Sequence, residues 1–123
     1  MPMPEASELA AFITDSFRSI WTLELLLFLK DHANVAWHNE SLVTALRASD
    51  AIVATSIEHL FAAGLILSDT KGAKYAPASK ELDELVDEAQ RLYASRPDAV
   101  RRLIVSRGTG LAAFASSFRI RRD

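Results

Sequence analysis

Residues 46–66 read LRASDAIVATSIEHLFAAGLI, and this stretch decides the fold. Ser49 is placed to cap a helix, because its side-chain oxygen can accept a hydrogen bond from a backbone N–H of the first turn. The apolar residues then repeat at spacings of four and three, typical of a helix packed on one side: Val53, Ile57 and Leu60. Gly64 follows the last of them and predicts a left-handed end to the helix.

The segments on either side extend this pattern into a helix-turn-helix followed by a hairpin. Before it, Asn39 is expected to cap a short helix over residues 40–47. Leu46 is the last of the apolar residues on the inward face of that helix. After it, two short apolar runs predict strands over 65–68 and 74–76. The residues between them, with Gly72, predict the bend of a β-hairpin.

The N-terminal third predicts one long helical region. We expect Ser7 to cap it, and apolar residues at helical spacing continue to about residue 29. Its later part is apolar nearly all round, with Trp21 and Leu25 among the apolar residues, so this helix belongs in the core or is shared with a partner chain.

The C-terminal third predicts three more helices. Ser79 should cap an amphipathic helix whose apolar stripe faces away from an acidic run within residues 81–88. Ser95 followed by Asp98 resembles a capping box and predicts the next helix, ended by Gly108. A last short helix is expected from Thr109 onward.

Charge is divided along the chain. Residues 1–90 carry 6 Lys and Arg against 14 Asp and Glu, whereas residues 91–123 carry 8 against 2. All eight positive residues of the second part are arginines, whose planar side chains favour bidentate contact with carboxylate or phosphate.

Length and composition limit the possible classes of protein. The chain has 123 residues, half of them hydrophobic, which fits one domain with a modest core. It contains no cysteine, which excludes disulfides and suggests a reducing, cytoplasmic setting. No apolar run approaches the roughly 20 residues needed to span a bilayer.

The order of elements resembles the winged helix-turn-helix family of bacterial transcriptional regulators. The resemblance covers roughly residues 20–77 and rests on these marks: Leu46, Ser49, Val53, Ile57, Leu60, the sequence Ala63-Gly64-Leu65-Ile66, Gly72 and Tyr75. It implies a mainly α fold with a small β-hairpin wing. Residues 1–80 would form the winged helix-turn-helix with its N-terminal helix, and residues 81–123 a helical extension for dimerisation or docking within the same globular domain.

The same resemblance implies a homodimer joined through its terminal helices, with the helix after Ser49 in the major groove of duplex DNA. The residues expected to meet DNA or another partner are Asn39, Ser41, Arg47, Asp50, Ala51, Ala54, Thr55, Glu58, His59, Lys71 and Lys74. The lysines would contact the phosphate backbone from the wing.

The charge of the recognition helix opposes this function. Arg, Lys, Asn and Gln are the side chains that best match base edges and phosphates, and residues 50–62 contain none of them. The donors on this helix would be Thr55, Ser56 and His59. The alternative hypothesis is a protein–protein interaction module, in which the same helix binds a protein through Ile52, Ala54, Thr55, Glu58 and His59.

The basic tail has three possible partners. Arg119, Arg121 and Arg122 follow an apolar face with Phe114 and Phe118. They could contact phosphate, an anionic membrane surface, or the acidic helix over 81–88 of the same or another chain. We favour docking on that helix, because the aromatic face requires burial and an acidic partner is already present.

Catalytic and metal-binding motifs are weak. Residues 108–113 match the spacing GxGxxA but leave no room for the strand that a dinucleotide site requires. Residues 68–71 match SxxK but fall on the expected hairpin bend. The histidines His32, His38 and His59 are scattered, with no cysteine to complete a metal site. We therefore expect no enzymatic activity, no metal and no cofactor.

Overall fold

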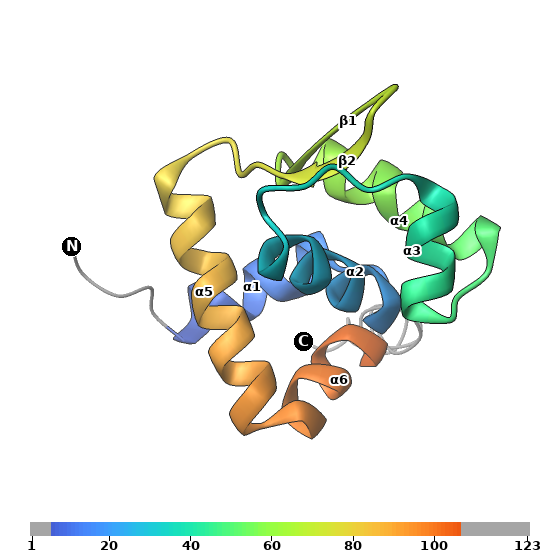
Figure 1. Ribbon diagram of the computed structural model, residues 1–123. Coiled ribbons are helices and arrows are strands. Elements are labelled where there is room, and N and C mark those ends of the chain that lie inside the picture. Colours follow the sequence, from blue (N-terminus) through green and yellow to red (C-terminus); the bar gives the residue numbers. More distant parts are fainter. Residues whose placement is uncertain (1–5, 107–123) are drawn as a thin grey trace.

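The computed structural model describes residues 6–106, which form helices and one β-hairpin (Figure 1). The elements in chain order are α1 Ala6–Ser16, α2 Ile20–Asp31, α3 Asn39–Leu46, α4 Asp50–Ala62, β1 Ile66–Asp69, β2 Gly72–Tyr75, α5 Lys80–Ser95 and α6 Pro97–Val105. This is the expected mainly α fold with a small β wing.

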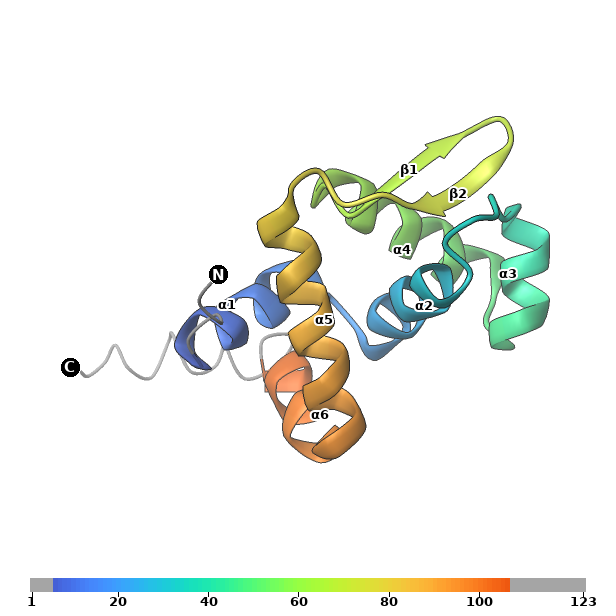
Figure 2. The same ribbon diagram turned by 60° about the vertical axis from the view of Figure 1, so that its left-hand side comes forward.

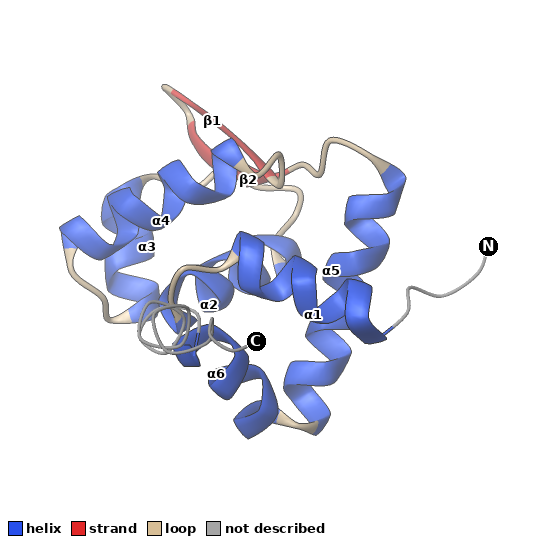
Figure 3. Cartoon of the chain, turned by 180° about the vertical axis from the view of Figure 1, so that it is seen from behind, coloured by secondary structure: helices blue, strands red, loops and turns tan. Residues whose placement is uncertain are grey.

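Helix α2 forms the centre of the structure. Figure 2 shows α3, α4 and the hairpin on one side of it and α1, α5 and α6 on the other. Four leucines of α2 are buried, as its apolar sequence predicts: Leu23, Leu25, Leu26 and Leu29. One core therefore runs through the molecule from the hairpin to α6. Figure 3 shows the same helices and the hairpin from behind.

The expected long N-terminal helix is wrong, because the chain turns between α1 and α2. Phe17 follows the end of α1 and is fully buried. The centre of its ring lies 5.7 Å from that of Phe12, in an edge-to-face arrangement. The Ser19 side chain then accepts a hydrogen bond from the Thr22 N–H at 3.3 Å and caps α2. The expected cap Ser7 lies within α1, which already begins at Ala6.

The helix-turn-helix forms where expected, with one correction. Helix α3 begins at Asn39 itself and has His38 at its N-cap, so Asn39 does not cap the helix. Arg47 takes a left-handed backbone conformation, with φ 55°, and ends α3. The Ser49 side chain accepts a hydrogen bond from the Ile52 N–H at 3.1 Å, as expected of the cap of α4. Gly64, with φ 78°, follows the end of that helix.

The loop of the hairpin is shorter than expected. Strands β1 and β2 pair antiparallel from Ile66 opposite Tyr75 to Asp69 opposite Gly72, so only Thr70 and Lys71 connect them. The Asp69 carboxylate accepts a hydrogen bond from the Lys71 N–H at 2.8 Å and thereby supports this tight turn.

A third chain segment joins the hairpin at Trp37. Its N–H donates to the Ala73 carbonyl and its carbonyl accepts from the Ala73 N–H, both at 2.8 Å. The Trp37 ring packs edge-to-face on Phe28, with centroids 4.8 Å apart. This approach leaves no room at Gly72, where a Cβ would lie 2.5 Å from the Trp37 carbonyl carbon.

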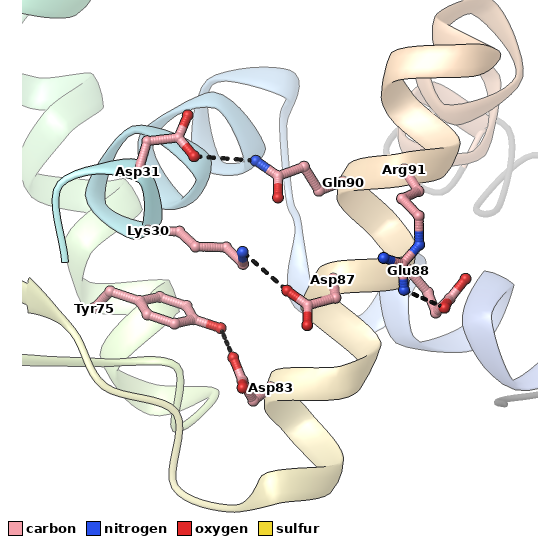
Figure 4. A network of polar contacts seen from close by, with 8 residues as sticks. All are labelled: Lys30, Asp31, Tyr75, Asp83, Asp87, Glu88, Gln90 and Arg91. Carbon is pink, nitrogen blue, oxygen red and sulfur yellow. Dashed lines mark hydrogen bonds and ion pairs between the residues drawn. The ribbon is translucent and has the colours of Figure 1, made fainter. Parts of the chain in front are cut away.

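Helix α5 is fastened to α2 and the hairpin by polar contacts (Figure 4). Its cap is Ser79, as expected, with an oxygen 3.1 Å from the Leu82 nitrogen. The contacts are Tyr75 to Asp83 at 2.5 Å, Lys30 to Asp87 at 2.9 Å and Gln90 to Asp31 at 3.2 Å. Burial, followed by the Asp83 carboxylate, raises the pKa of the Tyr75 phenol well above its ordinary value. The Tyr75 phenol therefore keeps its proton at neutral pH and continues to donate it to Asp83.

The capping box expected at Ser95 is wrong. Helix α5 continues through Ser95, whose hydroxyl donates to the Leu92 carbonyl at 3.3 Å. Helix α6 starts with Pro97, which fixes the first turn without needing its missing N–H, and Asp98 pairs with Arg101 at 3.3 Å. The predictions for Gly108 and for a last helix lie outside the described residues.

The two glycines with positive φ near the hairpin give a matched test of the Trp37 contact. Gly64→Ala adds only backbone strain, because its Cβ would meet Ala78 at an ordinary 3.4 Å; we expect a loss of about 1 kcal/mol in the free energy of unfolding. Gly72→Ala adds a collision with the Trp37 backbone, and we expect a loss of roughly 3–5 kcal/mol. Urea unfolding of both variants measures the difference, and equal losses would contradict the close approach.

Candidate functional site

Helix α4 packs on the protein by one face only. Val53 and Leu60 are fully buried on that face, and Ile57 is nearly so. Between them Ser56 shares a hydrogen bond of 3.2 Å with the Thr22 hydroxyl of α2, and both side chains are almost completely buried. This bond and the buried apolar face together hold α4 in one rotation, because turning the helix would break the bond and expose Val53 and Leu60.

The rotation of α4 turns its other residues outward. The exposed residues of this outer face are Asp50, Ala51, Ala54, Thr55 and Glu58. The helical spacing predicts all five. His59 and Ile52 are half-buried at the edge of the face. Ser56 is not on it, so the prediction that Ser56 donates to a partner is wrong.

Arg18 lies beside α4, which sequence reasoning missed. A groove of about 260 Å³ separates the start of α2 from α4. Its lining includes Arg18 and Ser19 from the segment before α2, and Ala51, Thr55 and His59 from α4. The Nδ1 atom of His59 is buried there without a hydrogen-bond partner among the described residues. No sequence signal marked Arg18, because it falls in a helix break without proline or glycine.

The expected polar residues of α3 and its following turn are also on the surface. Asn39, Ser41 and Thr44 are exposed, but the Thr44 hydroxyl already donates to the Glu40 carbonyl at 3.2 Å. Arg47 is exposed in the turn between α3 and α4. Of these residues only Arg47 lies in the turn before α4, and it adds one positive charge there.

The hairpin carries two exposed lysines. Lys71 is in the loop and Lys74 is on β2, opposite the exposed Leu67 of β1. Strand β1 packs against α4, so the wing and the helix belong to one surface of the molecule. We call the outer face of α4 with Arg18, Arg47, Lys71 and Lys74 the α4 surface.

The charge of the α4 surface is mixed. The four cations come from segments that neighbour α4, whereas the two carboxylates of Asp50 and Glu58 lie on the helix itself. A polyanion would therefore meet a locally acidic helix with positive charge on the segments around it.

The acidic helix expected to receive the basic tail already uses most of its carboxylates. Asp83 accepts from Tyr75, Asp87 pairs with Lys30, and Glu88 pairs with Arg91 of the same helix at 2.5 Å (Figure 4). Glu81 and Glu84 make no such contact among the described residues. The arginines Arg119, Arg121 and Arg122 lie outside the described residues, so their docking remains a prediction.

The described part of the chain, residues 6–106, holds neither a metal-binding cluster nor a membrane-spanning helix. No group of three or more His, Asp or Glu side chains in this part of the chain is arranged to hold a metal ion. None of the helices described there combines the length and the apolarity needed to cross a membrane.

Comparison of the chain with protein-family models, curated proteins and solved structures finds no significant match. Function must therefore be inferred from the α4 surface itself.

Two neighbouring residues of α4 test its orientation. Ser56→Ala removes a buried hydrogen bond, and we expect the free energy of unfolding to fall by about 1–2 kcal/mol. Thr55→Ala removes an exposed hydroxyl, and we expect a change within about 0.5 kcal/mol in either direction. Thermal and urea unfolding compare the two. A larger loss for Thr55→Ala would mean that α4 is rotated differently.

Proposed function

We propose that the chain is a winged helix-turn-helix transcriptional regulator that binds duplex DNA through the α4 surface. Helix α4 would enter the major groove, and the hairpin would lie on the adjacent backbone. As in the family that the sequence resembles, the regulator would act as a cytoplasmic homodimer joined through its terminal helices.

The observation that carries this proposal is the placement of the cations around α4. Arg18 lines the groove beside α4, Arg47 lies in the turn before it, and Lys71 and Lys74 lie on the hairpin, whose strand β1 packs on α4. Phosphate contacts supply most of the affinity of such proteins and fix their register on the duplex. Four contacts predict a plot of log affinity against log salt with a slope of about −3 to −4 per protomer.

The outer face of α4 can still read bases without Arg, Lys, Asn or Gln. Carboxylates accept hydrogen bonds from the amino group of cytosine, which gives Asp50 and Glu58 a role in the groove. The methyl groups of Ala51 and Ala54 match the methyl group of thymine. The proposal therefore specifies sites rich in cytosine and thymine on the strand that faces α4.

The test is a salt titration of DNA binding, using a duplex selected from a random pool at low salt. We expect Lys71→Glu/Lys74→Glu to weaken binding at least about tenfold and to make the salt slope shallower by about 2. Lys80→Glu is the matched control, because Lys80 is exposed at the start of α5. Selection of no duplex at low salt would refute the proposal.

A second function, a protein–protein interaction module, is favoured by one observation. Phe61 at the end of α4 is 53% exposed and Leu67 on the hairpin is 59% exposed. Large exposed apolar side chains beside a mixed-charge helix suit a protein partner better than a polyanion. Binding through them would depend little on salt, so the same titration separates the two functions.

A further inference from the structure

A solvent-open cavity of about 380 Å³ lies where α2 meets α3, α5 and α6. Its walls come from four helices, α2, α3, α5 and α6. The residues that matter for its chemistry are Ile20, Trp21, Glu24, Leu46, Tyr93 and Arg101. The volume lies within the range of small-molecule sites, about 300–1,000 Å³.

The polar wall of this cavity holds two opposite charges around one phenol. The Tyr93 hydroxyl donates to the Glu24 carboxylate at 2.5 Å. The guanidinium carbon of Arg101 lies 5.8 Å from the centre of the same ring. Burial and the Glu24 carboxylate raise the pKa of the Tyr93 phenol, so its proton stays on this bond at neutral pH.

Both charged groups retain capacity for a ligand. A carboxylate accepts about four hydrogen bonds, and Tyr93 supplies one to Glu24. Arg101 also pairs with Asp98, but those side chains are 52% and 83% exposed. An ion pair that is so exposed contributes little free energy and exchanges readily. Arg101 can therefore offer further N–H groups to an anion.

The apolar wall faces these charges. Trp21 is half-buried on α2, and Ile20 and Leu46 contribute aliphatic surface beside it. An indole ring next to aliphatic side chains suits a flat or branched apolar group, because aromatic faces stack on such groups favourably.

We propose that this cavity binds a small zwitterion of the amino-acid class with an aromatic side chain. Its ammonium would pair with Glu24, its carboxylate with Arg101, and its ring would lie on Trp21. A zwitterion satisfies both protein charges at once. A simple acid leaves Glu24 facing an anion, and a simple amine leaves Arg101 facing a cation, so both bind more weakly.

Leu46 connects the cavity to the turn between α3 and α4. It is the last residue of α3, immediately before the turn that leads to α4, whereas Tyr93 and Arg101 belong to α5 and α6. A bound zwitterion would join these two parts of the molecule. The proposed binding itself does not depend on whether the α4 surface contacts DNA.

The chain provides its own reporter for the test. It contains two tryptophans, so Trp37→Phe leaves Trp21 as the single one in the full-length protein. We would titrate this variant with phenylalanine, with 3-phenylpropionate, which lacks the amine, and with phenethylamine, which lacks the carboxylate. We expect phenylalanine to shift Trp21 emission saturably and to bind at least about tenfold more tightly than either analogue.

Charge variants test which protein residue binds each charged group of the ligand. Arg101→Gln should remove the preference for phenylalanine over phenethylamine, and Glu24→Gln the preference over 3-phenylpropionate. Arg102→Gln, an exposed neighbour outside the cavity lining, should change neither. If Trp37→Phe does not fold, the Trp21 indole N–H signal of the wild-type protein provides the same readout by NMR. No response of Trp21, equal affinity for the three compounds, or the same loss in Arg102→Gln would overturn the proposal.

Discussion

The buried hydrogen bond between Thr22 and Ser56 holds the two central helices in one orientation. Its free energy is modest, about 1 kcal/mol for a typical bond, but leaving the Ser56 hydroxyl buried without a partner costs more. Because α2 lies in the middle of the core, the position of α4 relative to α2 also sets the position of the hairpin. Together with the burial of Val53, Ile57 and Leu60, this contact sets the outer face of α4 and hence the candidate site.

The sequence predicts part of the local structure, although Ser7, Asn39 and Ser95 lie within helices instead of capping them. Ser49 and Ser79 cap their helices as expected, and Gly64 takes the left-handed conformation that ends α4, since each depends on residues a few positions away. Contacts between distant segments were not predictable. The pairing of Trp37 with Ala73 joins residues far apart in sequence, and only the structure explains why Gly72 has to lack a side chain.

The candidate site is likewise only partly predictable from the sequence. Helical periodicity places Asp50, Thr55 and Glu58 on the outer face, because it depends only on spacing along one helix. Arg18 comes from the segment between α1 and α2, and no pattern in the sequence links it to α4. The cavity with Glu24, Tyr93 and Arg101 is assembled from helices spread over most of the described chain, so its residues have no common motif.

The most direct test of the central claim is an NMR titration of the full-length protein with a selected duplex, followed through its backbone amide signals. If the α4 surface binds DNA, the largest shifts will fall on the outer face of α4, on the residues around Arg18 and on the hairpin loop at Lys71. Helix α5 and the cavity at Trp21 will change little. Shifts confined to residues 107–123, or the absence of any shift at low salt, would contradict the claim.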